Sequence, residues 1–158
     1  MMKKTLGTLF ILIVLTTVLY GYIETLPLPE LIKQAEYICI ARVVQIKEIS
    51  VNKEQVSTIK NVLSAEKIYK GKWQKNEPIV IMTKQCAPPG KLGWLEDQVT
   101  FPSKGLRVVI FFRKAPDGSL EPVNLVQGVW PMRKEDPQGM GYGITLKELE
   151  DEVNKQVK

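Results

Sequence analysis

Residues 37–49 read Tyr-Ile-Cys-Ile-Ala-Arg-Val-Val-Gln-Ile-Lys-Glu-Ile, a run that is rich in isoleucine and valine and contains neither glycine nor proline. Side chains of a strand point alternately to its two faces. Both faces are apolar here, with Ile38, Ile40, Val44 and Ile46 on one and Tyr37, Cys39, Ala41 and Val43 on the other. A strand that is apolar on both faces is buried on both faces, so the run predicts a long strand that is covered from two sides near its start.

Four further strands are predicted by runs of apolar and β-branched residues, at residues 57–69, 78–82, 106–112 and 122–129. The run 106–112 is the clearest of them, because its two alternating sets of positions are both well defined. In the second run the apolar neighbours Val62-Leu63 and Ile68-Tyr69 break the alternation. That irregularity predicts a β-bulge or a bend in the strand.

Helices are predicted on both sides of this set of strands. Apolar residues recur at helical spacing before the first strand and predict a short helix over 29–36. After the last strand, Thr145 and Glu148 have the spacing of a capping box, which marks the start of a helix over 145–155. One apolar stripe follows that box, so this helix is expected to pack one face against the strands.

Five strands, a helix at each end and a long connection between the third and fourth strands predict a mainly β fold. We expect a small closed or nearly closed barrel, because closure removes the exposed edges of short strands. The length of the chain suits one domain with a real core. The predicted organisation is a single barrel domain over 29–158, preceded by a spacer at 22–28.

Several short motifs are similar to those of one known group of domains. The stretch Leu31-Ile32-x-x-Ala35-Glu36-x-Ile38-x-x-Ala41-x-Val43 resembles the opening of small exported bacterial domains related to the OB-fold barrels of the tissue-inhibitor-of-metalloproteinases and netrin type. Glu36 stands where that group usually has aspartate, and Ala41 where it usually has glycine. Three more stretches are similar to its second, fourth and fifth strands, namely Ile68-Tyr69-Lys70-Gly71, Val108-Val109-Ile110-Phe111-Phe112 and Gln127-Gly128.

The resemblance covers residues 28–150 and implies a five-stranded OB-like barrel with a short N-terminal helix and a C-terminal helix. It implies little about function, since most of that group has no assigned activity. The inhibitor branch chelates a protease zinc through an N-terminal Cys-x-Cys motif. This sequence has no such motif, so metalloprotease inhibition is not carried over.

The N-terminus has the pattern of an export segment. Lys3 and Lys4 precede an apolar run of roughly 14 residues, which is followed by the small residue Gly21. A transmembrane helix normally needs about 20 apolar residues, so we expect a signal peptide at 1–21. The alternative is an uncleaved anchor, in which residues 1–22 hold the chain at the membrane. In both cases we expect an extracytoplasmic domain, whether secreted, periplasmic or on the cell surface.

Composition argues against several functions. The formal net charge of +5 is mild and spread along the chain, whereas nucleic-acid binding normally needs a dense cationic surface. The chain has no histidine, which removes Ser-His and Cys-His nucleophile pairs as well as histidine-ligated zinc. We therefore expect no nucleic-acid partner and no catalysis of these types.

Acidic neighbours occur at 96–97, 135–136 and 150–152. General acid–base catalysis needs two carboxylates that converge across a cleft, and side chains of sequence neighbours point apart. We interpret all three groups as solvated surface, with a weak Ca²⁺ contact at 96–97 as an alternative. The expectation is a chain that is not an enzyme and has no cofactor and no metal site.

The two cysteines, Cys39 and Cys86, form an even number in a chain that is predicted to be exported. That context predicts a disulfide between them. Cys39 falls early in the first strand and Cys86 just after the third, and a five-stranded barrel can bring such positions together. The alternative is that Cys39 is a small buried apolar residue.

The loop at 86–95, Cys-Ala-Pro-Pro-Gly-Lys-Leu-Gly-Trp-Leu, belongs to the long connection before the fourth strand. Long connections in compact domains are often functional, and a loop tryptophan is a common binding anchor. Trp94 and Lys91 are therefore candidate binding residues, and Trp73 is a third. The alternative is that Trp94 packs over one end of the barrel. Trp130 is expected to pack rather than to bind a ligand.

The sequence favours an exported, non-catalytic binding module of the cell envelope or the secreted fraction. Its expected partner is a protein, a peptide or a glycan outside the cytoplasm. The alternative is a structural accessory domain that is tethered by the uncleaved N-terminal segment and has no ligand of its own.

Overall fold

The computed structural model describes residues 25–74, 76–86, 98–139 and 143–156, so the predicted export segment lies outside the described part. The secondary-structure elements, in chain order, are α2 (Leu28–Gln34), β1 (Tyr37–Val51), β2 (Ser57–Lys70), β3 (Ile79–Gln85), β4 (Arg107–Lys114), β5 (Leu120–Pro122), the 3₁₀ turn η2 (Leu125–Gly128), β6 (Val129–Arg133), β7 (Asp136–Pro137) and α3 (Leu146–Gln156).

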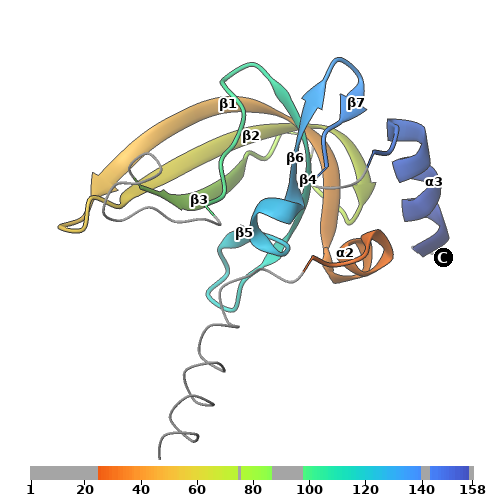
Figure 1. Cartoon of the computed structure of the whole chain (residues 1–158), viewed down its shortest axis with the longest axis horizontal. Helices are drawn as coiled ribbons and strands as arrows, with labels where there is room; N and C mark the ends of the chain where they lie inside the picture. Colours follow the sequence, from red (N-terminus) through yellow and green to blue (C-terminus); the bar gives the residue numbers. More distant parts are fainter. Residues whose placement is uncertain (1–24, 75, 87–97, 140–142, 157–158) are drawn as a thin grey trace, which may run out of the picture.

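Five strands close into the predicted barrel (Figure 1). The strand order is β1-β2-β3-β5-β4, and β4 pairs with β1 to complete the circle. All of these pairings are antiparallel except that of β3 with β5, where Ile81 lies opposite Leu120. The fold is therefore a mainly β, OB-like barrel with one short helix before it and one helix after it.

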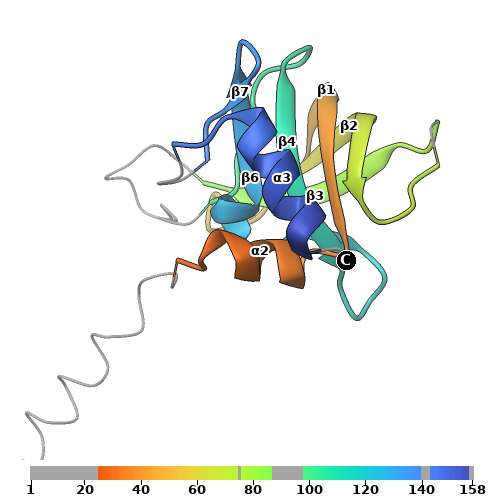
Figure 2. The ribbon, with the colours of Figure 1, turned by 90° about the vertical axis from the view of Figure 1, so that its right-hand side faces the viewer.

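Two apolar clusters explain why β1 is apolar on both faces. The barrel interior holds one set of its side chains, including Cys39 and Ala41, together with Leu63 and Ile110. The other set, Ile38 and Ile40, packs on the outside of the barrel in a second cluster. That cluster also contains side chains of α2, α3 and β6, namely Leu31, Ile32, Ala35, Trp130, Leu149 and Val153. Figure 2 shows both helices covering this wall of the barrel.

The bulges predicted from the broken alternation are present. Between Ile38 and Cys39 the register with β2 shifts so that Tyr69 has no partner, which confirms an irregularity at that position. Opposite Val62 and Leu63 the additional residue belongs to β1 and is Val44. Bulges bend a strand and increase its twist, and the paired strands β1 and β2 curve strongly in Figure 1.

β1 and β2 are much longer than the barrel needs. β4 covers β1 only from Tyr37 to Arg42, and the rest of β1 continues with β2 toward a hairpin tip. β3 accompanies β2 over Ser57 to Leu63. Beyond the pairing of Ile81 with β5, these three strands form a projection, which we call the arm and which consists of residues 44–60 and 82–85. It points to the left in Figure 1, away from α2 and α3.

The prediction of a fifth strand over 122–129 is wrong in its bounds. β5 ends at Pro122, and the chain then turns with left-handed backbone at Asn124 and Leu125. η2 follows and places Gly128 so close to the preceding chain that a Cβ would meet the carbonyl oxygens of Val123 and Phe111. The strands β6 and β7, which extend the sheet beyond β4, are not foreseen in the sequence.

Both predicted helices are present, and specific hydrogen bonds mark their ends. At the start of α3, Thr145 donates its backbone N–H to the Glu148 carboxylate over 2.7 Å, and the Glu148 N–H donates to Thr145 Oγ1 over 3.3 Å. This confirms the capping box. At the end of α2, Lys70 Nζ donates to the carbonyl oxygens of Ile32 and Lys33. No helix in the described part of the chain is long and apolar enough to cross a membrane.

The predicted disulfide is wrong, because both cysteines are free thiols. Cys39 lies opposite Ile68 near one end of β2, and Cys86 follows Gln85, which lies opposite Ser57 at the other end. At about 3.3 Å per residue this length of strand spans on the order of 35 Å. A disulfide requires Cα atoms within about 7 Å. The alternative interpretation holds for Cys39, which is fully buried in the barrel.

Candidate functional site

Trp73 is the predicted binding residue that the structure describes; Trp94 and Lys91 lie outside the described residues. Trp73 follows the end of β2 and lies at the end of the barrel opposite the arm. Its ring meets Tyr37 edge to face with centroids 5.2 Å apart, and meets Phe112 in the same way at 5.5 Å. Its Nε1 donates to the backbone oxygen of Glu77 over 2.9 Å. These contacts hold the indole in one place.

Gly71 brings Trp73 to this position. Its φ of +82° lies in the left-handed region, which glycine adopts without strain. A Cβ at Gly71 would lie 2.6 Å from the carbonyl oxygen of Glu36 and 2.6 Å from Cδ1 of Tyr37. The turn therefore needs glycine for its backbone conformation and for space, and it places the indole against the first residue of β1.

A hollow of about 470 Å³ lies beside the indole and is lined by Ile68, Gly71, Lys72, Trp73 and Gln74. It combines an aromatic ring with an ammonium group and a side-chain amide. Ligand sites commonly have this mixture of an apolar surface and a few polar groups. Two other hollows are described, one beside β7 and one between α2 and α3, and neither is lined by an aromatic side chain.

Trp130 is not a ligand-binding residue. Its side chain is fully buried and packs on Phe111 with ring centroids 4.6 Å apart. Its Nε1 donates to the backbone oxygen of Gln127 over 2.6 Å. A buried indole normally finds such an acceptor, and this confirms the expectation that Trp130 packs.

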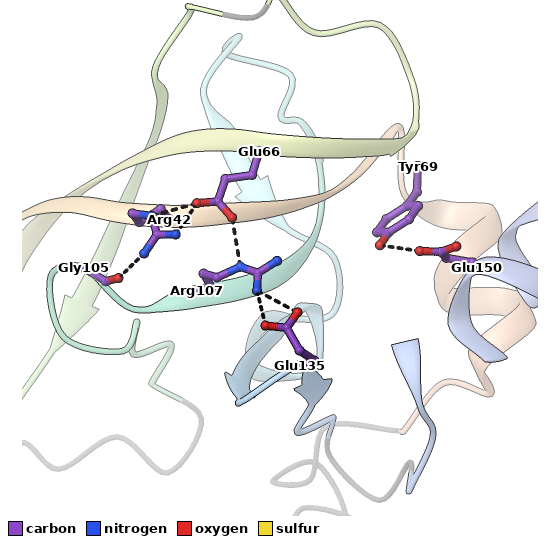
Figure 3. Close-up of polar contacts among 7 residues, drawn as sticks. All are labelled: Arg42, Glu66, Tyr69, Gly105, Arg107, Glu135 and Glu150. Atoms are coloured by element: carbon purple, nitrogen blue, oxygen red, sulfur yellow. Dashed lines mark hydrogen bonds and ion pairs between the residues drawn. The ribbon is translucent and has the colours of Figure 1, made fainter. Parts of the chain in front are cut away.

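An ion-pair network that the sequence analysis missed crosses the outer wall of the barrel (Figure 3). Glu66 on β2 receives hydrogen bonds from Arg42 of β1 over 2.7 Å and from Arg107 of β4 over 2.9 Å. Arg107 also donates to both carboxylate oxygens of Glu135, in the hairpin between β6 and β7. The only signal for this network in the sequence is that each arginine interrupts an apolar strand.

A second polar contact attaches α3 to the barrel and also appears in Figure 3. Glu150 of α3 accepts hydrogen bonds from Tyr69 Oη over 3.0 Å and from Lys67 Nζ over 2.6 Å. The Lys67 ammonium holds the pKa of the Glu150 carboxyl below its usual value. Burial, followed by the hydrogen bond to Glu150, raises the pKa of Tyr69. Both groups therefore keep their ordinary charge at neutral pH and act as structural contacts.

These contacts offer no pair of free carboxylates for acid–base chemistry. Both oxygens of Glu66 and of Glu135 face arginine side chains, and Glu150 faces a lysine. Burial raises the pKa of the Cys39 thiol to about 12, so it is protonated and unreactive at neutral pH. Within the described ranges, no group of three or more His, Cys, Asp or Glu residues is placed to hold a metal ion.

No protein-family model matches this chain, and no curated protein matches it in a sequence search. The relationship to barrels of the tissue-inhibitor-of-metalloproteinases and netrin type therefore stays a prediction. Because one fold serves many functions, a function for this chain has to be argued from its own surface.

Proposed function

We propose that the chain is an exported, non-catalytic binding module that receives its ligand in the hollow beside Trp73. The observation that carries this proposal is an indole that is held by two aromatic contacts and one hydrogen bond, yet still lines an open hollow. A ring that is already fixed loses little conformational entropy when a ligand stacks on it. Export is supported by the lysine and apolar pattern of residues 1–21.

The composition of the hollow suggests the class of ligand. The indole offers a flat apolar surface, while Lys72 and Gln74 offer hydrogen-bond donors beside it. A sugar ring or a short peptide segment, each with one apolar face and several acceptor oxygens, fits such a surface. We therefore favour a glycan or a peptide over an extended protein surface.

The test compares the binding of envelope glycans and short peptides by the purified domain and by its Trp73→Ala and Lys72→Ala variants. Leu125→Ala is the matched control, since Leu125 is 48% exposed and lies on η2, away from the hollow. The proposal predicts at least a tenfold loss of affinity in Trp73→Ala and unchanged affinity in the control. Equal binding by all variants would exclude this hollow. Failure of the unmodified domain to bind any member of either set would favour the accessory-domain alternative.

Export is tested separately, by expressing the full chain in a bacterium and sequencing the N-terminus of the extracytoplasmic material. The proposal predicts a chain that begins near Tyr22. Material that still carries residues 1–21 and stays with the membrane would support the anchor. Recovery of the chain only from the cytoplasm would contradict export altogether.

A further inference from the structure

The arm carries three lysines in one row on its outer face. Lys47 of β1 lies directly opposite Lys60 of β2. On β3, Met82 lies opposite Lys60, and Lys84 lies opposite Thr58, so that Lys84 is the diagonal neighbour of Lys60. Directly opposite residues have Cβ atoms about 5 Å apart and diagonal ones about 7–8 Å, so the three lysine side chains leave the sheet close together on three neighbouring strands.

Alternation of buried and exposed residues shows that these lysines share the outer face. On β2, Ile59 and Asn61 are buried on the inner face, which leaves Lys60 on the outer one. On β3, Ile81 and Thr83 are buried in the same way, and Met82 between them is 46% exposed. Opposite residues of an antiparallel pair point to the same face, so Lys47 joins Lys60 there.

The charges on this face are not compensated. Arg42, Arg107, Lys67 and other cations have carboxylate partners, but within the described part of the chain no ion pair involves Lys47, Lys60 or Lys84. The carboxylate of Glu48 belongs to the opposite face, where Glu48 lies across from Ile59, and it accepts a hydrogen bond from Ser57. Like charges directly opposite each other destabilise a sheet. Such an arrangement is relieved when an anion binds across the row.

We propose that the outer face of the arm binds a linear polyphosphate chain. Lysine ammonium groups bind phosphate as point charges, with little demand on geometry. A row of three matches successive negative groups along a chain that crosses the strands. An anionic bilayer is less suitable, since its recognition usually needs a cluster of four to eight cationic residues. Within the row, Met82 is the one exposed apolar side chain.

This site is independent of the hollow beside Trp73, because it lies on the other part of β1 and β2 and shares no residue with it. Binding should weaken with salt through the release of counterions. For three phosphate contacts the affinity should fall by about 20-fold between 50 and 200 mM salt. Each lysine that is removed should lower the slope of log K against log salt by about 0.7.

The experiment titrates the full domain with long-chain inorganic polyphosphate and compares it with two triple variants of equal net charge. The first, Lys47→Gln, Lys60→Gln and Lys84→Gln, removes the row. The second, Lys33→Gln, Lys104→Gln and Lys114→Gln, removes three exposed lysines elsewhere on the surface. The proposal predicts that the first variant loses affinity at least tenfold and also loses most of its dependence on salt. The second variant and Trp73→Ala should bind as the wild type does.

Three results would overturn the proposal. One is no binding of polyphosphate by the wild-type domain. Another is an equal loss in both triple variants, which would mean a general charge effect. The third is tighter binding to vesicles of phosphatidylglycerol and phosphatidylcholine, or to a sulfated glycan, than to polyphosphate. Loss of polyphosphate binding in Trp73→Ala would instead show that the two surfaces form one site.

Discussion

The two halves of β1 have similar residues and different surroundings. Residues 38–42 pair with β2 on one side and β4 on the other, and all of them except Arg42 are buried. Residues 44–51 pair with β2 alone in the described part of the chain, and each of them is exposed. Four β-branched apolar side chains of this second half are 40 to 50% exposed, namely Val44, Ile46, Ile49 and Val51.

Burial along one strand therefore depends on the elements that pack against it as much as on its residue types. The first half has helices over one face and the barrel interior under the other. The second half has neither, so it keeps apolar and charged groups available to a partner. Exposed apolar residues that lie together often mark interaction surfaces.

The largest expected effect is at Trp130, which packs over the barrel half of β1. Trp130→Ala should lower the free energy of unfolding by about 3–5 kcal/mol, because it leaves a cavity beside Phe111 and removes a buried hydrogen bond. Truncation of an exposed side chain in the arm, Val51→Ala, should stay within about 0.5 kcal/mol. Urea denaturation measures both. Similar losses at the two positions would contradict the division of β1 into halves.

A smaller effect is expected where Gly71 touches the first residue of β1. Gly71→Ala and Gly118→Ala both place alanine at positive φ, but only Gly71 has atoms in the way of a Cβ. Gly71→Ala should therefore cost about 1–3 kcal/mol more than Gly118→Ala. Thermal unfolding of the two variants checks this difference. Equal stability of the two variants would contradict the close contact between Gly71 and Tyr37.

The helix α3 covers the barrel half of β1, and its N-terminal cap should contribute less to stability than Gly71 does. Thr145→Ala should cost about 0.5–2 kcal/mol through loss of the capping box, while Thr145→Ser should retain most of the stability. Denaturant midpoints of the three proteins measure this effect. No difference between the alanine variant and the wild type would refute the assignment of the cap.

The same cap should depend on pH. Hydrogen bonds from Thr145 hold the pKa of the Glu148 carboxyl below its usual value. A lowered folded-state pKa adds stability that is fully present above the unfolded-state pKa and is lost as the pH falls through the folded-state pKa. The penalty of Thr145→Ala should therefore be larger at pH 7 than near pH 3. A penalty that is independent of pH would mean that the Thr145 hydroxyl does not bond to the Glu148 carboxylate.

The smallest expected effect is in the arm, and it has the opposite sign. Lys60→Gln removes the cation between Lys47 and Lys84, and it should raise the free energy of unfolding by about 0.2–1 kcal/mol at low salt. The gain should shrink in high salt, because salt screens surface charges. A loss of stability would show that Lys60 has a structural partner and that the row is not strained.

Much of this fold could be predicted from the sequence, for local physical reasons. The regular alternation at 106–112 and the double apolar pattern at 37–43 have one simple solution, which is a strand between two packed layers. The spacing of Thr145 and Glu148 likewise specifies a helix start within a few residues.

The remainder depends on contacts between distant residues. The turn η2 depends on Gly128 fitting against the carbonyl oxygens of nearby Val123 and of Phe111 in β4, and the run of apolar residues there is equally suited to a strand. The network around Glu66 joins four segments that only the register brings together. The lysine row is invisible in the sequence for the same reason, since its members are far apart along the chain. Of the candidate site, only Trp73 could be named in advance.

Native-state hydrogen exchange along β1 tests most directly whether this strand is part barrel and part arm. Amides of residues 38–43 should exchange only through global unfolding, since they lie in the buried barrel wall. Amides of residues 45–51 should exchange at least tenfold faster through local opening of the arm, because only β2 holds them. Equal protection along the whole strand would contradict the account, since the arm would then be as firmly held as the barrel.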